Sequence, residues 1–322
     1  MRKTAITVVD FAARAERELT ILLYHGVTNT VSADIENYSG KHMHVDEFAK
    51  QIRYVKQRCA ILSFDDIVSL SQEGKPFPPR SVAVSFDDGF ANNYSVAAPV
   101  LDACNVPAIF YVSTGVVSTN LMFWVDELED CLNRSGKPII TVTLDVPRTF
   151  HLGTRGQRIA SLETIKGYCK RVSTEVQGHI LTEVKIATEI EPSVEHAENY
   201  RKITWPQLRE MAASPLFTIG GHSLYHSILS ELPLERMTAD IRLSIDLLRY
   251  QLRQPIIHYS YPEGQAWHYN AAVIATLKAS GIVCCPSAIH GLNPIGTDLF
   301  QLKRIMVGMP ENPFPFSESA IH

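Results

Sequence analysis

Short apolar runs alternate with amphipathic stretches in the first third of the chain. Residues 19–24, 81–86 and 107–112 are nearly continuous apolar runs of five or six residues, which is typical of buried strands. Residues 45–58 and 93–104 instead place their apolar side chains at helical spacing. The order strand, helix, strand predicts βαβ units and a parallel sheet.

The same alternation resumes near residue 216, and the segment before it has a different character. From about residue 120 to 200 charge rises, helical patterns dominate and buried-strand signals are few. Further strands and helices are predicted at residues 216–221, 233–253, 256–261, 269–280, 282–285 and 302–307. We therefore predict a single α/β domain over residues 1–322, with a mostly helical insertion at about 120–200.

Composition and charge narrow the classes of function. The chain has 322 residues, 45% hydrophobic and 20% charged, with a net charge of −4. This length is normal for an α/β barrel with insertions. The acidic balance, without a dense run of Lys and Arg, argues against nucleic acid as a partner, and no pattern indicates a partner protein.

The location of the protein is predicted from two absences in the sequence. No apolar run approaches the ~20 residues of a membrane span, and the run at residues 5–9 is too short for a signal peptide. The six cysteines form neither a CxxC pair nor a zinc-finger spacing. We predict a cytoplasmic protein with reduced, mostly buried thiols.

The tetrapeptide Ser-Phe-Asp-Asp occurs twice, and its first copy predicts a helix start. Ser63 is followed three residues later by Asp66 and then by an apolar-periodic stretch. This arrangement resembles a capping box, and acids in the first turn favour the positive end of the helix dipole. We expect Asp65 and Asp66 to begin a helix and to have no other role.

The second copy ends a predicted buried strand, where α/β proteins gather functional residues. Asp87 and Asp88 are adjacent and are followed by Gly89. Two neighbouring carboxylates repel each other unless positive charge lies beside them, and a divalent cation would supply it. Asp-Asp-Gly is also ordinary turn chemistry, so this motif alone decides nothing.

A histidine pair follows another predicted strand, residues 216–221. His222 and His226 are four residues apart, so on a helical turn both rings project to one side, which suits a single metal ion. By itself the pair is equally compatible with chance. Together with one aspartate it forms a ligand set that leaves positions open for water and substrate.

The sequences SFDDG and HSLYHS together resemble the first two motifs of the polysaccharide deacetylases, carbohydrate esterase family four, whose fold is the NodB homology domain. The resemblance runs from residue 22 to about 307, with 120–200 poorly matched. It implies a distorted (β/α) barrel of about seven strands. It also implies Asp88, His222 and His226 as metal ligands and Asp87 as general base. The metal would be Zn²⁺, with Co²⁺ or Ni²⁺ also suited to these ligands.

The third motif departs from the family pattern. The family commonly has Arg-x-Pro-aromatic, whereas this chain has Ser260 at the arginine position, followed by Tyr261, Pro262 and Glu263. The segment resembles a branch with a Tyr-Pro-x-Gly motif. That branch implies the backbone N–H of Glu263 as oxyanion donor, with Tyr261 and Pro262 beside the substrate. Arg304, in the last predicted strand, is positioned to pair with an acid of the site.

The general acid is also expected from an unusual position. The late histidine of most family members is missing, and in the Tyr-Pro-x-Gly branch an early Tyr-His motif takes its role. Here that motif implies His25, with His290 as the reserve candidate. Trp124 opens the insertion, where it would either stack on a sugar or pack the insertion.

These residues predict a metal-dependent hydrolase that removes an N-acetyl group from an N-acetylated sugar or glycan intermediate, in surface polysaccharide biosynthesis. Two alternatives stay open at this stage. The same fold could hydrolyse a small amide. The missing arginine also leaves room for an inactive carbohydrate-binding or scaffold protein.

Overall fold

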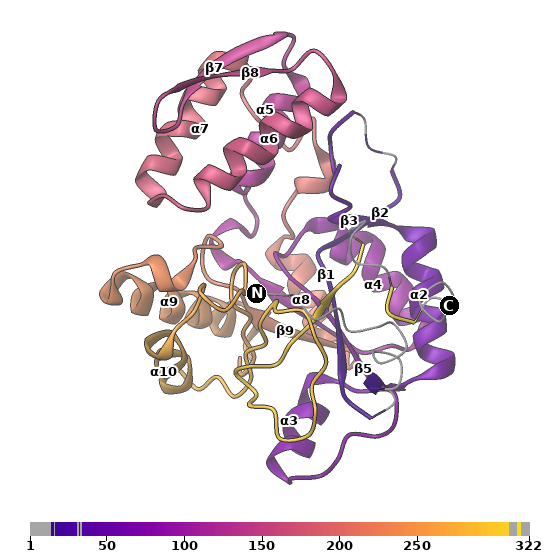
Figure 1. The fold of residues 1–322 in the computed structure, drawn as a ribbon. Helices are drawn as coiled ribbons and strands as arrows, with labels where there is room; N and C mark the ends of the chain where they lie inside the picture. The colour runs from indigo at the N-terminus through magenta and orange to yellow at the C-terminus, as the bar shows by residue number, and fades with distance from the viewer. Residues whose placement is uncertain (1–13, 16, 31, 33, 309–313, 317–322) are drawn as a thin grey trace. The chain divides into compact units, whose positions relative to one another are not determined.

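The computed structural model describes residues 14–15, 17–30, 32, 34–308 and 314–316. The chain divides into two compact units (Figure 1). The first is drawn from residues 1–29, 40–118 and 203–322, and the second from residues 30–39 and 119–202. The predicted insertion thus corresponds to the second unit, which also takes in ten residues from the region before β3 (His42–His44).

A parallel sheet is the centre of the first unit. Its strand order is β10-β1-β5-β6-β9, and β4 pairs with β5 beside this path. The bounds are β1 Thr20–Tyr24, β4 Ala60–Ile61, β5 Ser81–Phe86, β6 Ala108–Val112, β9 Phe217–Gly221 and β10 Ile305–Met306. Every pairing in this sheet is parallel, which confirms the predicted α/β class.

The pairing continues beyond β9 and returns to β10. Gly221 pairs in parallel with Tyr259, and His258 pairs with Cys284. The backbone N–H of Ser287 then donates to the carbonyl of Leu302 (2.8 Å), which leads into β10. Five strands and two bridging segments therefore form a ring of seven, as the resemblance implied, although the two bridging segments are too short to count as strands.

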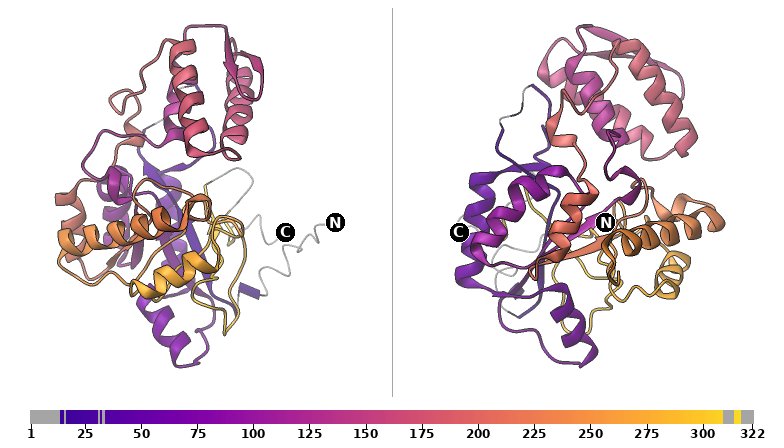
Figure 2. Two further views of the ribbon diagram at one scale, coloured as in Figure 1. Left: turned by 90° about the vertical axis from the view of Figure 1, so that its left-hand side faces the viewer. Right: turned by 180° about the vertical axis from the view of Figure 1, so that it is seen from behind.

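Helices cover the outside of this ring. α2 (Val45–Arg58) and α4 (Ala98–Cys104) lie on one side of the strands, and α9 (Leu234–Leu252) and α10 (Ala271–Ala279) on the other (Figures 1 and 2). Because side chains alternate along a strand, one set of strand residues packs on the helices and the other set lines the interior. Leu22, Val84 and Phe110 belong to the outer core, and Ile21, Ala83 and Ile109 to the inner one.

The first Ser-Phe-Asp-Asp begins α3 (Phe64–Gln72), as predicted. The hydroxyl of Ser63 accepts from the N–H of Asp66 (3.1 Å), whose carboxylate accepts from the N–H of Ser63 (2.8 Å). The expectation that Asp65 has no other role is wrong. Its carboxylate lies 2.8 Å from Nε2 of the buried His258. This contact links α3 to the segment of His258 and Tyr259, which continues the sheet beyond β9.

The second unit has its own hydrophobic core. It contains α5 (Trp124–Arg134), α6 (Arg155–Cys169), α7 (Thr174–Thr188) and an antiparallel hairpin of β7 (Ile139–Thr143) and β8 (Pro147–His151). The helices were predicted and the hairpin was not. In β7 only alternate residues are buried, so the hairpin lacks the continuous apolar run that identified the other strands.

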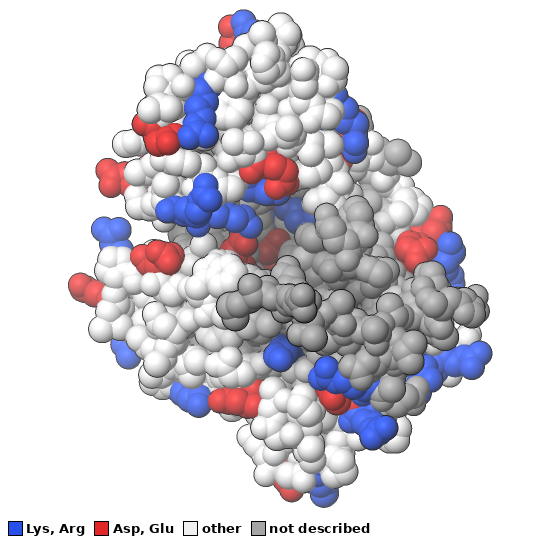
Figure 3. Space-filling model, in the orientation of Figure 1, with Lys and Arg blue, Asp and Glu red and all other residues white. Residues whose placement is uncertain are grey.

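Surface charge and hydropathy agree with the composition. On the face shown in Figure 3, Lys and Arg lie singly or in small groups among Asp and Glu, without a broad basic surface over the described residues. Within those residues no helix combines the length and the apolar character needed to cross a bilayer. All six cysteines are free thiols that are buried or half-buried.

Candidate metal centre and active site

Strand register brings the predicted site residues to one edge of the sheet. Tyr24 pairs with Phe86, and Val112 pairs with Gly221. His25, Asp87 and His222 each follow one of these strands directly, so all three lie at the carboxyl edge of the same parallel sheet. This is the edge at which parallel α/β proteins bind their ligands.

Asp88, His222 and His226 converge as a ligand set. Oδ1 of Asp88 lies 3.4 Å from Nε2 of His226 and 3.6 Å from Nε2 of His222. Two ligand atoms that each bind a tetrahedral metal ion at ~2.1 Å are ~3.4 Å apart, so the spacing suits a shared cation. Oδ1 of Asp88 is buried and has no hydrogen-bond partner. Burying an unpaired carboxylate oxygen lowers the stability of the fold unless another group, such as a cation, binds it. The residues present therefore fit a divalent cation.

The backbone is strained at this point in a way that serves the site. Asp88 has a φ of 80°, a conformation that non-glycine residues rarely adopt. Successive residues of a strand point to opposite faces, and the left-handed turn lets Asp87 and Asp88 face the same site. Gly89 is also left-handed, and a Cβ there would lie 2.8 Å from Cγ1 of Val112, so only glycine fits.

Hydrogen bonds fix the turn that carries both histidines. Nδ1 of His222 donates to the carbonyl of Ser260 (2.9 Å), which leaves Nε2 free to bind metal. The N–H of Ser223 donates to the hydroxyl of Tyr259 (2.7 Å), and the N–H of Leu224 donates to Asp240 (3.0 Å). Both acceptors are buried side chains. Sequence reasoning missed them because neither lies in a motif.

Arg304 supplies the guanidinium that the third motif lacks. Its two terminal nitrogens each lie 2.7 Å from a different carboxylate oxygen of Asp87, and the arginine side chain is fully buried. The same guanidinium donates to the hydroxyl of Ser260 (2.8 Å) and to the carbonyl of Ser287 (2.7 Å). The expectation that Arg304 pairs with an acid of the site is confirmed.

The charges around the site keep both carboxylates ionised. Burial alone would raise the pKa of Asp87, but the charge of Arg304 lowers it below its ordinary value. Burial likewise opposes ionisation of Asp88, and the neighbouring His226 and His222 hold its pKa well below the usual range. Burial lowers the pKa of His226 to about 4. Burial also disfavours the charged form of His222, but the charges of Asp87 and Asp88 raise the pKa of that imidazole. Metal binding requires an ionised carboxylate and neutral imidazoles, so a cation would displace any proton that His222 carries.

His25 and Glu263 lie within electrostatic range of this centre. Burial lowers the pKa of His25, and the charges of Asp88 and Asp87 partly offset that effect. The charge of Glu263 acts on the pKa of His226, and Glu263 has a left-handed backbone with φ 58°. The reserve candidate His290 is exposed.

The three side chains predicted to contact substrate offer little free surface. The ring of Tyr261 is fully buried and stacks on Tyr269 with centroids 4.0 Å apart. Pro262 is also buried. Trp124 lies in the second unit, where it packs partly buried against that unit's core.

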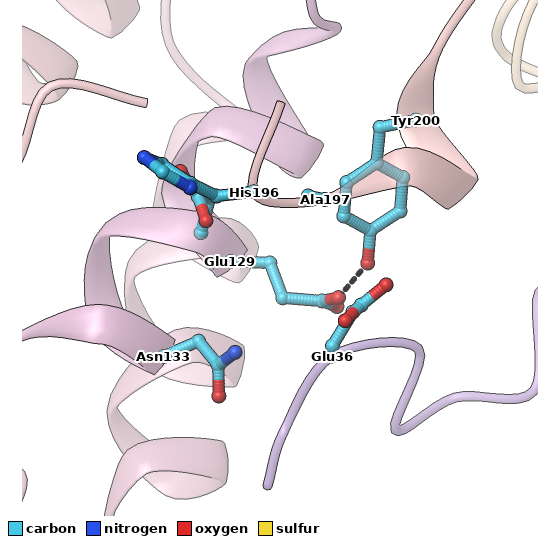
Figure 4. Close-up of a pocket in the computed structure, with 7 residues that line it drawn as sticks. Glu36, Glu129, Asn133, His196, Ala197 and Tyr200 are labelled. Atoms are coloured by element: carbon cyan, nitrogen blue, oxygen red, sulfur yellow. Dashed lines mark hydrogen bonds between the residues drawn. The ribbon is translucent and has the colours of Figure 1, made fainter. Parts of the chain in front are cut away.

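A small cavity in the second unit lies among carboxylates (Figure 4). Glu129 accepts from the hydroxyl of Tyr200 and from the N–H of Asn37 (2.8 Å), and Glu36 accepts from Asn199 (2.9 Å). The space open to water is about 10 Å³, room for about one water molecule. This cavity is too small for a sugar.

Comparison with known proteins agrees with the geometry of the metal centre. The family model for polysaccharide deacetylase matches residues 74–285. The chain belongs to the polysaccharide deacetylase family. Over 91 residues the chain is 36% identical to the poly-beta-1,6-N-acetyl-D-glucosamine N-deacetylase of Staphylococcus epidermidis. That match covers 28% of the chain and 30% of the relative, so it spans under a third of either protein.

Solved structures share the fold over more than nine-tenths of the chain. IcaB from Ammonifex degensii has a TM-score of 0.61 at 18% identity, over 95% of this chain and 96% of that one. The Streptococcus pyogenes deacetylase PplD, in complex with acetate, has a TM-score of 0.59 at 17% identity, over 92% and 95%. At these identities the likeness establishes the fold.

Tyr259→Phe tests whether the hydroxyl of Tyr259 fixes the turn that carries His222 and His226. The change removes the acceptor for the N–H of Ser223, and we expect zinc affinity to fall about 10- to 100-fold, as for other supports of metal ligands. Zinc affinity is measured by competition with a chromophoric chelator. The matched control is Tyr261→Phe, which removes a buried hydroxyl that donates to the carbonyl of Phe300. Equal zinc affinity in the two variants would contradict the role of Tyr259.

Proposed function

We propose that this protein is a divalent-metal-dependent hydrolase that removes acetyl groups from an N-acetylated glycan during surface polysaccharide synthesis. The observation that carries the proposal is the juxtaposition of two differently partnered carboxylates. Asp88 faces His222 and His226, whereas Asp87 is bound by Arg304. One carboxylate is thus suited to bind a cation and its neighbour to act as a base.

The reaction follows from what these groups can do. A bound Zn²⁺, the cation that best suits an Asp-His-His set with open positions, would polarise the acyl oxygen and make water available as a nucleophile at neutral pH. Asp87 accepts a proton from the attacking water, and the N–H of Glu263 donates to the developing oxyanion. His25, in its protonated form, gives a proton to the leaving amine; burial lowers the pKa of His25, and the charges of Asp88 and Asp87 favour the protonated form. The products are acetate and a free amine.

The substrate class is inferred from the named relatives. The Staphylococcus epidermidis relative is named for poly-beta-1,6-N-acetyl-D-glucosamine. We infer that this chain acts on a β-linked polymer of N-acetylhexosamine, in preference to a nucleotide-linked or lipid-linked sugar. A cytoplasmic location stays a prediction from the sequence.

Arg304 also bears on the two alternative functions. The inactive-scaffold alternative depended on the missing arginine of the third motif, and a guanidinium reaches Asp87 from the last strand instead. That reason for the alternative is therefore gone. Hydrolysis of a small amide would use the same groups, and a screen for acetate release from glycans and simple amides separates the two substrates.

Asp87→Asn tests the base. Asparagine keeps the size of the side chain but cannot accept a proton, so kcat for acetate release from β-1,6-linked N-acetylglucosamine oligomers should fall about 10²- to 10⁴-fold. Zinc content, measured by elemental analysis, should stay at the wild-type level because the ligands are intact. An Asp87→Asn variant that released acetate at the wild-type rate would refute the assignment of Asp87 as the base. If the wild-type protein released acetate from simple amides and from no glycan, the substrate would be a small amide and not a glycan.

Arg304→Lys tests how the base is held. Lysine keeps the charge but cannot make the two parallel hydrogen bonds to Asp87. A displaced base should lower kcat by about 100-fold, while KM and zinc content change little. The control is Arg249→Lys, since Arg249 also donates to backbone carbonyls, of Ile256 and Ser280, outside the site. Similar loss of kcat in both variants would mean that Arg304 acts only through stability.

A further inference from the structure

Six large apolar side chains of the first unit are more than half exposed among the described residues: Tyr225, Leu234, Leu243, Tyr250, Trp267 and Ile295. Single exposed apolar residues are common and need no special explanation. Tyr225 and Trp267 differ from the other four because both lie on segments that carry the candidate site. They are 57% and 69% exposed.

Tyr225 lies between the two histidine ligands, and its ring rests on a glycine. The carbonyl of Leu224 accepts from the N–H of Gly115 (2.8 Å), and the N–H of Leu224 donates to Asp240. A Cβ on Gly115 would lie 2.6 Å from Cε1 of Tyr225, so the ring packs directly over the Cα of that glycine. The ring is therefore supported from below by fixed backbone while much of it stays open to solvent.

Trp267 lies four residues after Glu263, in a loop that is tied to the segment following His226. The hydroxyl of Ser230 donates to the carbonyl of Trp267 (2.8 Å), and the N–H of Ser230 donates to the carbonyl of His268 (3.4 Å). The indole meets the ring of His268 at 75°, with centroids 5.3 Å apart. The loop backbone is thus fixed, and most of the indole faces solvent.

Exposed aromatic rings in these positions can bind a sugar, whereas they contribute little to the stability of the fold. Neither ring belongs to a hydrophobic core, so folding forgoes the stabilisation that their burial would bring. A pyranose with equatorial substituents presents a flat face of C–H groups, and the negative face of an aromatic ring attracts such groups. Tyr and Trp also lose little conformational entropy when they bind.

We propose that Tyr225 and Trp267 are stacking platforms for the pyranose rings that flank the sugar whose acetamide enters the metal site. The ligand is a β-linked N-acetylhexosamine chain, and the proposal rests on the glycan deacetylation proposed above. Recognition of the flanking rings would make the protein prefer oligomers to a single sugar.

Binding to a catalytically blocked protein tests the platforms apart from turnover. The β-1,6-linked N-acetylglucosamine hexamer is titrated by calorimetry into the zinc-loaded Asp87→Asn protein, alone and with added Tyr225→Ala or Trp267→Ala. Each alanine should raise Kd about 3- to 10-fold, the range expected for one aromatic contact. Tyr225→Phe and Trp267→Tyr keep a ring and should stay within about twofold of the parent.

Two controls make the result specific. Tyr250→Ala removes an aromatic ring that is 74% exposed on α9 and should leave Kd unchanged. Zinc content equal to the parent shows that Tyr225→Ala has not disturbed the metal turn. An unchanged Kd in both alanine variants, or no binding of the hexamer to the parent, would overturn the platforms.

Acetate release by the wild-type protein is scored separately. If wild type deacetylates the hexamer while the alanine variants keep the parental Kd, the platforms fail and the proposed function stands. If the hexamer binds with the expected dependence on both rings but no acetate is released, the platforms stand and the proposed reaction fails.

Discussion

Two buried carboxylates stand next to each other in this protein, and each needs its own positive partner. Because Asp87 and Asp88 are adjacent in a region of low dielectric, repulsion between the two carboxylates would otherwise keep one of them protonated. Arg304 binds Asp87 through two bonds of 2.7 Å. Removing one partner from such a buried pair typically costs about 3–5 kcal/mol. Asp88 faces two imidazoles with an unpaired oxygen, the arrangement of a metal ligand.

This requirement explains the placement of several distant segments. The guanidinium comes from Arg304, directly before the last strand, β10, which pairs with β1 next to β5, so the stabilisation of Asp87 depends on this strand pairing. The small side chain of Ser260 accepts from that guanidinium, and its carbonyl accepts from His222. One residue of the third motif thus links the base to the metal ligands. Parallel pairing between strands from both ends of the sequence therefore assembles the site.

Much of this architecture could be predicted from local patterns. Continuous apolar runs identified β1, β5, β6 and β9, and strand order then placed Asp87 and His222 at one edge. The capping box at Ser63 was also readable, since its two partners are three residues apart. These features depend on residues that are near in sequence or fixed by a strand end.

The remaining features depend on contacts between distant residues. Asp65 meets His258 across 193 positions, and Tyr259 reaches Ser223 across 36. The hairpin of the second unit was missed because most residues of its two strands are exposed. Tyr261 was interpreted as a motif residue beside the substrate, although its ring lies inside the core. The position of Arg304 in the last strand suggested a pairing with an acid, but that the acid is Asp87 follows from the pairing of β10 with β1 beside β5.

The central claim is that Asp88, His222 and His226 share one divalent cation. X-ray absorption spectroscopy of the zinc-loaded protein tests it directly, because the spectrum reports the ligand atoms around the metal. We expect one zinc per chain, with two imidazole nitrogens and carboxylate or water oxygens at ~2.0–2.2 Å. A sulfur shell at ~2.3 Å, a spectrum without imidazole scattering, or an unchanged spectrum in the His222→Ala protein would contradict it.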